Sequence, residues 1–291
     1  MSEYIIMTDS SCDLTQEMAD ELELTVVPLN VTIDGKTCFN YLDGREIGFK
    51  DFYARMRAGS VAKTSAINQA QALTAIEEAA AAGKDVLFLA FSSGLSATYS
   101  AAATAMEQLR PKYPERKLYA VDTLCASLGQ GLFIWYCCQR KKAGEDIDQV
   151  YSWAEEHKLE LCHLFTVDDL MFLKRGGRVS AATAIIGSAL SIKPVMHVDD
   201  EGHLIKTGIA RGRKGSLKAL ADEMDKRVKD FKDLPVFISH GDCIDDVEYL
   251  ANLIRSRHSE VGMIHTNYVG PVIGAHSGPG TVALFFMGSP R

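Results

Sequence analysis

Residues 85–110, DVLFLAFSSGLSATYSAAATAMEQLR, contain one complete transition from strand to helix. The run at 85–91 is apolar after its first residue, and this predicts a strand buried on both faces. The alanine-rich run at 96–110 predicts a helix, because alanine has the highest helix propensity. Three serines and a glycine lie at the turn between them. A buried strand that leads directly into a helix is typical of α/β folds.

The same alternation of short apolar runs and helical patterns continues along the chain. Strands are expected at 4–8, 24–33, 85–91, 117–123, 160–167, 193–199, 234–241, 261–269 and 281–287. Helices are expected at 16–22, 49–57, 68–82, 96–110, 126–142, 146–157, 211–230 and 245–258. This order predicts an α/β protein with largely parallel sheets. Residues 198–211 differ, because two extended runs flank Asp200-Glu201-Gly202, and they predict an inserted antiparallel hairpin.

The length of 291 residues is sufficient for two ordinary domains. One strand-helix series ends near residue 158, where another begins. We therefore expect an N-terminal α/β domain over 1–158 and a C-terminal α/β domain with the hairpin over 159–291.

Charge and composition exclude several classes of protein. The net charge of −7 disfavours nucleic acid as a partner. Seven cysteines, an odd number without C-x-x-C spacing, favour reduced thiols over a disulfide framework or a zinc site. The start MSEYIIMTDS has no basic segment followed by an apolar one, and no apolar run approaches the length of a membrane span. We expect a cytoplasmic protein.

Hydroxyl-rich segments follow several of the expected strands. They are TDSSCDLT (8–15), KTSAINQ (63–69), SSGLSATY (92–99) and VDTLCAS (121–127). Ser, Thr and Asp are preferred helix N-caps, so each segment alone can be explained by capping. In α/β sheets such points also collect backbone N–H groups and the positive ends of helix dipoles. The second interpretation is therefore a binding site for an anion.

Motifs for an enzyme are missing at these positions. A serine nucleophile elbow needs G-x-S-x-G, but Gly94 directly follows Ser93, and Ser96 lies between Leu95 and Ala97. GRKGS (212–216) lacks the order of a P-loop, and no H-E-x-x-H occurs. The alternative of a stand-alone acyl hydrolase or phosphotransferase would have to use the turn at Ser92 and Ser93.

Two further segments carry candidate binding residues. In DDLMFLKRGGRVSAATAIIGSALSIKPV (168–195), basic side chains surround two glycines before an apolar stretch. This is either a solvated helix end before a core helix or a cationic gate beside an apolar wall. GPVIGAHSGPG (270–280) predicts a glycine-rich loop around His276, where backbone can approach a ligand closely.

Seven segments in this order resemble the DegV family. They are TDSSCDL, KTS, SSGLSATY, DDLMFLKRGGRVS, KPV, ARGRKG and GPVIGAHSGPGT, and they extend from residue 8 to about residue 285. DegV proteins are bacterial fatty-acid-binding proteins, and some are the acyl-binding subunits of a two-part fatty acid kinase. The chain departs from the family pattern at Ala66 and Ile67, where Gln and Pro are usual, and at Ala97, where glycine is common.

The resemblance implies a lipid-binding protein that is not itself an enzyme. Its ligand would be one long-chain fatty acid, similar to palmitate, stearate or oleate, buried between two α/β domains without a cofactor or metal. The implied carboxylate-binding residues are Thr64, Ser65, Ser92, Ser93, Ser96 and His276. The register does not decide among the three serines of the turn, nor between Thr64 and Ser65.

The same resemblance implies roles for the basic residues. Arg175 and Arg178 match the family's basic element near the carboxylate. Arg211 and Arg213 match a segment that faces the kinase catalytic subunit in members that have one. A kinase would then be a protein partner, nucleic acid would not be one, and contact with a membrane would be transient.

Overall fold

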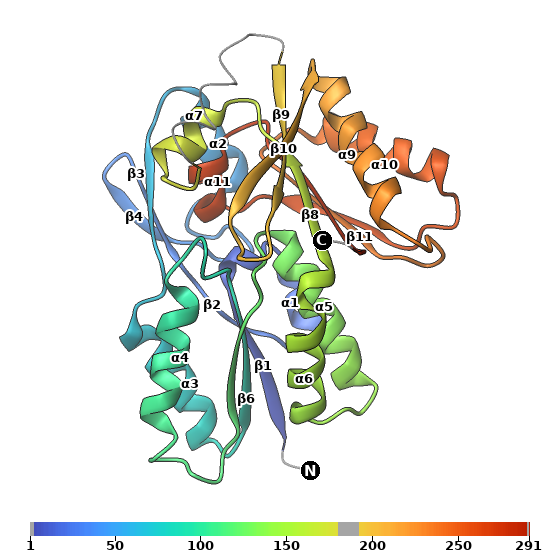
Figure 1. The fold of residues 1–291 in the computed structure, drawn as a ribbon. Coiled ribbons are helices and arrows are strands. Elements are labelled where there is room, and N and C mark those ends of the chain that lie inside the picture. Colours follow the sequence, from blue (N-terminus) through green and yellow to red (C-terminus); the bar gives the residue numbers. More distant parts are fainter. Residues whose placement is uncertain (1–2, 180–191, 290) are drawn as a thin grey trace.

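The computed structural model describes residues 3–179, 192–289 and 291 (Figure 1). Its two larger sheets come from different halves of the chain. A four-stranded sheet uses strands between residues 4 and 122, and a six-stranded sheet uses strands between residues 161 and 287. The α/β class expected from the sequence is confirmed, while the domain boundary near residue 158 stays a prediction.

The four-stranded sheet is parallel throughout. Its order is β2 (Thr25–Val27), β1 (Tyr4–Asp9), β6 (Asp85–Ala90) and β7 (Leu118–Asp122). Helices α3 (Gln69–Ala81) and α4 (Thr98–Leu109) lie on one side of it, and α5 (Leu128–Lys142) and α6 (Ile147–His157) lie on the other (Figure 1).

Strand β6 explains why residues 85–110 specify this arrangement. All six of its residues are buried. Val86 and Phe88 belong to the apolar cluster that contains α3 and α4, whereas Leu87 and Leu89 belong to the cluster that contains α5 and α6. Because side chains alternate between the faces of a strand, a strand covered by helices on both sides must be apolar at every position.

The six-stranded sheet differs from the expectation of parallel pairing. Its order is β10 (Leu204–Arg211), β9 (Ile192–Val198), β8 (Leu161–Thr166), β13 (Val282–Met287), β11 (Val236–His240) and β12 (Ile264–Tyr268). Of these neighbouring pairs, only β11 and β12 run parallel. The expected hairpin is confirmed as β9 and β10, with Val198 opposite Leu204.

The two faces of the six-stranded sheet are covered differently. Helices α9 (Arg213–Arg227) and α10 (Ile244–Arg257) pack on one face (Figure 1). On the other face, Phe165 and Phe285 share an apolar cluster with Leu132 of α5. Helix α5 therefore packs against both large sheets and joins the two halves of the molecule.

A third sheet corrects another prediction. The strand expected at 24–33 is two strands, because the chain leaves β2 at Pro28 and enters β3 (Asn30–Ile33). Strand β3 pairs antiparallel with β4 (Lys36–Phe39) and β5 (Ala62–Ser65), neither of which was predicted as a strand. Proline has no N–H to donate, so it ends pairing within the apolar run.

The expected helices agree with the structure to within a few residues, and α2 (Phe49–Arg57) agrees at both ends. Within the described residues, the remaining short helices are α1 (Gln16–Glu21), α7 (Leu170–Arg175), α11 (Pro271–Ser277) and the 3-10 turns Ser10–Cys12 and Lys158–Glu160. Helix α11 replaces the loop predicted at 270–280, so that prediction was wrong. The apolar wall predicted after Arg178 falls largely on residues 180–191, outside the described residues.

Candidate functional site

A cavity of about 290 Å³ is lined by residues from both halves of the chain. The six-stranded sheet contributes one side, and β5, α11 and the turns before α4 and α5 contribute others. Its apolar lining residues are Leu29, Ala66, Phe91, Leu95, Ala97, Ala126, Phe165, Leu173, Val198, Leu204, Val269, Val272, Ile273, Ala283 and Phe285. Such walls fit an apolar chain rather than a sugar or nucleotide.

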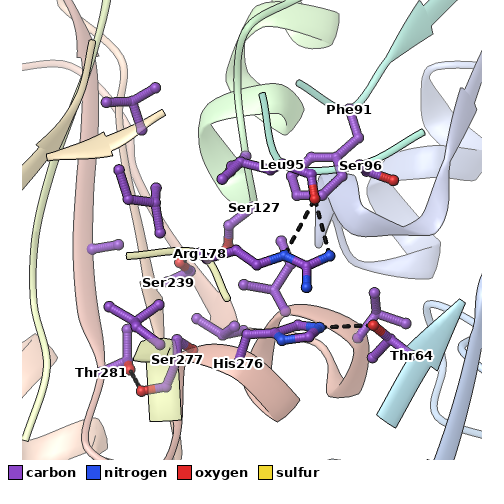
Figure 2. Close-up of a pocket in the computed structure, with 18 of the residues that line it drawn as sticks. Thr64, Phe91, Leu95, Ser96, Ser127, Arg178, Ser239, His276, Ser277 and Thr281 are labelled. Atoms are coloured by element: carbon purple, nitrogen blue, oxygen red, sulfur yellow. Dashed lines mark hydrogen bonds between the residues drawn. The ribbon is translucent and has the colours of Figure 1, made fainter. Parts of the chain in front are cut away.

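Among the residues that the structure describes, one cationic side chain faces this cavity. Arg178 lies on its lining, and no Asp or Glu is among the described residues that line it. The guanidinium donates to the Leu95 carbonyl from Nη2 at 3.1 Å and from Nε at 3.3 Å (Figure 2). Its Nη1 donates to the Gly176 carbonyl. Across the described ranges it forms no ion pair. Burial lowers the pKa of Arg178, yet a guanidinium stays charged at neutral pH.

A neutral histidine lies beside this charge. Thr64 Oγ1 and His276 Nε2 are 2.7 Å apart, so β5 and α11 meet at this contact (Figure 2). Burial, and then the charge of Arg178, lowers the pKa of His276 to about 4. A Cβ at position 176 would overlap His276 Nδ1, so Gly176 permits this packing. Arg178 is therefore the charged group of the site at neutral pH.

Five of the predicted binding residues meet at the cavity. Thr64, Ser65, Ser96, Arg178 and His276 all line it, although they come from four separate segments. Ser96 Oγ lies 3.0 Å from Thr98 Oγ1, at the start of α4. Ser65 is exposed while it lines the cavity, so the cavity reaches the surface on this side. The structure thus groups hydroxyls, an imidazole and a guanidinium at one opening.

Ser92 and Ser93 lie elsewhere. Neither is among the lining residues. Ser92 is fully buried, and its Oγ donates to the Gly202 carbonyl at 2.9 Å, which fixes the turn before α4 to the β9–β10 hairpin. Ser93 is exposed, and its backbone N–H donates to Asp122. The contact of Ser92 supports the packing interpretation for that residue. Ser96 lines the cavity, and its Oγ also accepts from the Thr98 N–H at 3.3 Å, so Ser96 contributes to the start of α4 as well.

The other predicted basic residues also lie outside the lining. Arg175 is exposed, and its guanidinium lies 5.3 Å from the ring centroid of Phe172. Arg211 is exposed at the end of β10. Arg213 is half-buried and forms an ion pair with Asp246 at 2.8 Å. Of the four predicted arginines, the structure brings only Arg178 to the cavity.

Some polar lining residues were not singled out from the sequence. Ser127, Ser239 and Ser277 line the cavity together with His163 and Thr281. Ser127 ends one of the hydroxyl-rich segments, so the strand-end pattern contained this signal. Ser239 lies within the end of β11, where the same pattern could have found it.

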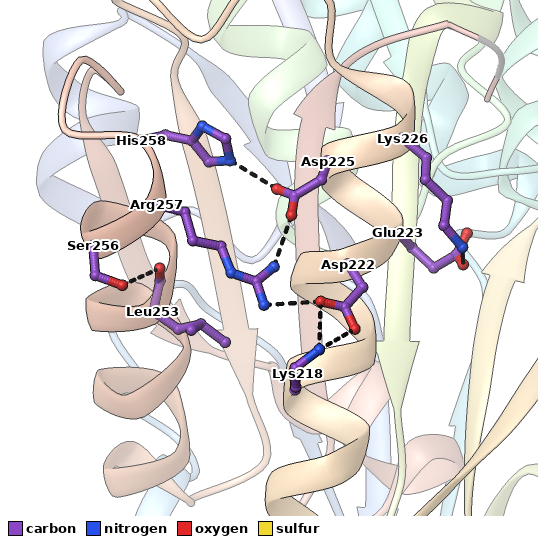
Figure 3. Close-up of polar contacts among 9 residues, drawn as sticks. All are labelled: Lys218, Asp222, Glu223, Asp225, Lys226, Leu253, Ser256, Arg257 and His258. Atoms are coloured by element: carbon purple, nitrogen blue, oxygen red, sulfur yellow. Dashed lines mark hydrogen bonds and ion pairs between the residues drawn. The ribbon is translucent and has the colours of Figure 1, made fainter.

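A cluster of charges on α9 and α10 is structural rather than part of the cavity. Arg257 forms ion pairs with Asp222 and Asp225 at 2.8 Å, Lys218 pairs with Asp222 at 2.7 Å, and His258 Nε2 lies 2.7 Å from Asp225 (Figure 3). None of these side chains lines the cavity. The cluster joins the two helices that cover one face of the six-stranded sheet.

Removing Arg257, which pairs with both Asp222 and Asp225, should weaken the contact between α9 and α10. We expect Arg257→Ala to lower the free energy of unfolding by about 1 kcal/mol in low salt, and by less in high salt, because partly exposed ion pairs are screened. Urea unfolding at two salt concentrations measures this. Lys226→Ala is the matched control, since Lys226 pairs, among the described residues, only with Glu223 across one turn of α9 and is largely exposed. Equal effects of the two variants would contradict the prediction.

His276 should make the stability of the protein sensitive to acid. Its pKa is about 4 in the folded protein and 6.5 as its ordinary value, so the unfolded chain binds the proton first as the pH falls. This group should therefore lower the free energy of unfolding by about 2 kcal/mol between pH 7 and pH 5.

The measurement compares urea unfolding of the protein and of His276→Gln at pH 7 and pH 5. Groups that titrate in both proteins cancel in the difference. The variant should gain about 2 kcal/mol relative to the original protein on acidification, because glutamine does not titrate. A difference that does not change with pH would show that His276 keeps an ordinary pKa in the folded state.

The described parts of the chain contain neither a membrane-spanning helix nor a cluster of metal ligands. None of the helices over 3–179 and 192–289 is long and apolar enough to span a bilayer. Over the same ranges, no group of three or more His, Cys, Asp or Glu side chains is placed to hold a metal ion.

The fold and the site together define an α/β protein that encloses an apolar cavity with a cationic group near its opening. The model of the family described as "Uncharacterised protein, DegV family" matches residues 4–289. The chain belongs to the DegV family, as the order of its motifs predicted.

Known proteins resemble this chain in sequence and in structure along nearly its whole length. A DegV domain-containing protein of Clostridium perfringens is 44% identical over 291 residues, which are 100% of this chain and 99% of that protein. A fatty-acid-binding DegV family protein from Thermus thermophilus has a similar structure, with a TM-score of 0.89, 28% identity, and coverage of 99% of this chain and 100% of that one. DegV of Bacillus subtilis, a fatty acid binding protein, has a TM-score of 0.85 at 25% identity, with the same coverage.

Proposed function

We propose that this protein binds one long-chain fatty acid, with the acyl chain in the cavity and the carboxylate at Arg178. The observation that carries the proposal is the charge of Arg178 on a lining that has no acidic residue among those described. A partly buried cation without an anionic partner is costly, and a carboxylate would neutralise it. The fatty-acid-binding relatives from Thermus thermophilus and Bacillus subtilis support the same ligand.

The neighbouring groups suit a carboxylate. The hydroxyls of Thr64 and Ser96 and the neutral imidazole of His276 line the cavity with Arg178. Hydroxyls can donate to a carboxylate, and hydrogen bonds to an ionised group are stronger than those between neutral groups. In this proposal Ser65 lies at the opening, and the carboxylate stays accessible from the surface.

Polar contacts are needed because burial of the chain alone is insufficient. The roughly fourteen methylenes of a sixteen-carbon acid gain about 11 kcal/mol on leaving water, at about 0.8 kcal/mol each. A bilayer offers the chain nearly the same gain. The difference that draws the acid from membrane to protein must therefore come from the carboxylate site and from the shape of the cavity.

The direct test is to find the ligand. The protein is expressed in a bacterial host, purified without added lipid and denatured, and the organic extract is examined by mass spectrometry. About one equivalent of a long-chain fatty acid is expected. A lipid-free protein that also fails to bind added palmitate or oleate would overturn the proposal.

We also propose that the bound acid is presented to a kinase that forms an acyl phosphate. The accessible carboxylate end and the exposed side chains of Arg175 and Arg211 support this role. The loaded protein, with ATP and a lysate of its own bacterium, should yield an acyl hydroxamate when hydroxylamine is added. The chain and ATP alone should yield none. A lysate that forms no more hydroxamate with the protein than without it would contradict the kinase partnership.

The alternative of an acyl hydrolase at Ser92 and Ser93 finds little support. The Ser92 hydroxyl is engaged by the Gly202 carbonyl and the Gly94 N–H, and neither group can act as a general base. Ser93 is exposed and lies outside the cavity lining.

A further inference from the structure

The cavity has a second set of polar groups, separate from the carboxylate end. Figure 2 shows Thr64 and Ser96 on one side of the cavity and Ser239 and Ser277 on the other. Ser239 belongs to β11, and Ser277 is the last residue of α11. With Ser127 at the start of α5, these serines interrupt walls that are otherwise largely apolar.

Ser277 has an unused hydroxyl. The residue is 5% exposed, and its Oγ has no hydrogen-bond partner among the described residues. Its carbonyl, by contrast, accepts a hydrogen bond from Thr281 Oγ1 at 3.0 Å. Most buried polar side-chain atoms in proteins have a partner, so a buried hydroxyl without one on a ligand cavity points to a partner on the ligand.

Ser239 also has hydrogen-bonding capacity left toward the cavity. Ser127 Oγ donates to Asp13 Oδ2 at 2.5 Å and lies 2.8 Å from Ser239 Oγ. Because Asp13 takes the Ser127 hydrogen, the hydrogen between the two serines comes from Ser239. A hydroxyl oxygen can also accept, so a lone pair of Ser239 Oγ remains available to a donor in the cavity.

The backbone holds Ser127 in this position at some cost. Its φ of 56° and ψ of −146° lie in a region that residues other than glycine rarely adopt. Its hydrogen bonds to Asp13 and Ser239 hold it there. A wall built only to contact methylenes would need neither this backbone conformation nor the three hydroxyls.

We propose that the cavity prefers fatty acids that carry a hydroxyl on the acyl chain, and that Ser277 donates to this hydroxyl while Ser239 accepts from it. The inference rests on the proposed function, because it requires an acyl chain in the cavity. A plain chain would leave the Ser277 hydroxyl against methylenes without a partner and would leave the remaining lone pair of Ser239 unused. A hydroxylated chain would satisfy both, and unsatisfied buried polar groups are what such sites discriminate against.

The test measures the affinity of delipidated protein for stearic acid and for a series of hydroxystearic acids with the hydroxyl at different carbons. We expect at least one isomer to bind ten times more tightly than stearic acid. Ser239→Ala and Ser277→Ala should each reduce that preference, the ratio of the two affinities, at least threefold. Thermal unfolding of each variant checks that it is folded.

Thr166→Val is the matched control. Thr166 is fully buried, and its Oγ1 also lacks a partner among the described residues, but it does not line the cavity. This variant should keep the full preference. If stearic acid binds as tightly as every isomer, or if the preference survives both serine substitutions, the inference is wrong. If neither kind of acid binds, the proposed function itself fails.

Discussion

Replacing Arg178 by glutamine should weaken the binding of palmitate at least a hundredfold. The guanidinium is the charged group on the described lining, and charge-assisted hydrogen bonds contribute about 1.5–3 kcal/mol each. Glutamine keeps an amide that can still donate to the Leu95 carbonyl, so the loss should come from the charge. The affinities are measured by titration of delipidated protein.

A second ligand separates the charge from the apolar contacts. Hexadecanol has the same chain as palmitate but no charge. The original protein should prefer palmitate, and Arg178→Gln should lose this preference while its affinity for hexadecanol changes little. Arg175→Gln is the matched control, because it removes the same charge from an exposed side chain outside the lining. If Arg178→Gln binds palmitate within threefold of the original protein, the carboxylate does not lie at Arg178.

Replacing Gly202 by alanine should lower the free energy of unfolding by about 3 kcal/mol or more, because two effects combine. Gly202 has a φ of +79°, which side chains with a Cβ rarely adopt. A Cβ there would also overlap Ser92 Oγ, whose hydroxyl donates to the Gly202 carbonyl. The substitution therefore separates the β9–β10 hairpin from the turn that leads into α4.

The same hairpin provides the control. Gly208 has no positive φ, and the nearest atom to a Cβ there would be Val195 Cβ at 3.9 Å, an ordinary contact. Gly208→Ala should change stability by less than about 1 kcal/mol. Adding Ser92→Gly to Gly202→Ala removes the overlap and should recover part of the loss. Urea unfolding of the four proteins tests this, and equal stability of the two alanine variants would refute the account.

Binding should change with Gly202 as well. Leu95 and Ser96 follow Ser92 in the same turn. The Leu95 carbonyl accepts two hydrogen bonds from the Arg178 guanidinium, from Nε and from Nη2. A shift of this turn would therefore move the guanidinium. The structural contact at Ser92 and the proposed contact with the carboxylate at Arg178 are parts of one arrangement.

Elements with a strong local pattern were predictable from the sequence. The apolar run of β6 and the alanine-rich helix α4 follow from burial on both faces and from helix propensity. The misses have local reasons too. Pro28 divides an apolar run into β2 and β3, which join different sheets. Residue composition does not say which neighbours a strand pairs with.

Helix α11 shows tertiary structure overriding local preference. Its segment is rich in glycine, which disfavours helices, although Pro271 occupies a favourable first position. A Cβ at Gly274 would lie 2.5 Å from Tyr53 Oη, so glycine here permits close packing against α2. That contact comes from a residue more than two hundred positions away and could not be read locally.

The sequence by itself determined the kinds of groups at the site: hydroxyls at strand ends, basic side chains around a pair of glycines, and a histidine among glycines. Their chemistry follows from residue type and from position at strand-helix turns. Tertiary structure decided which of them meet. Thr64 and His276 touch across 212 residues, and Ser96 rather than Ser92 reaches the cavity. The reason is that a cavity is formed by packing between distant segments, whereas a sequence pattern records only what lies nearby along the chain.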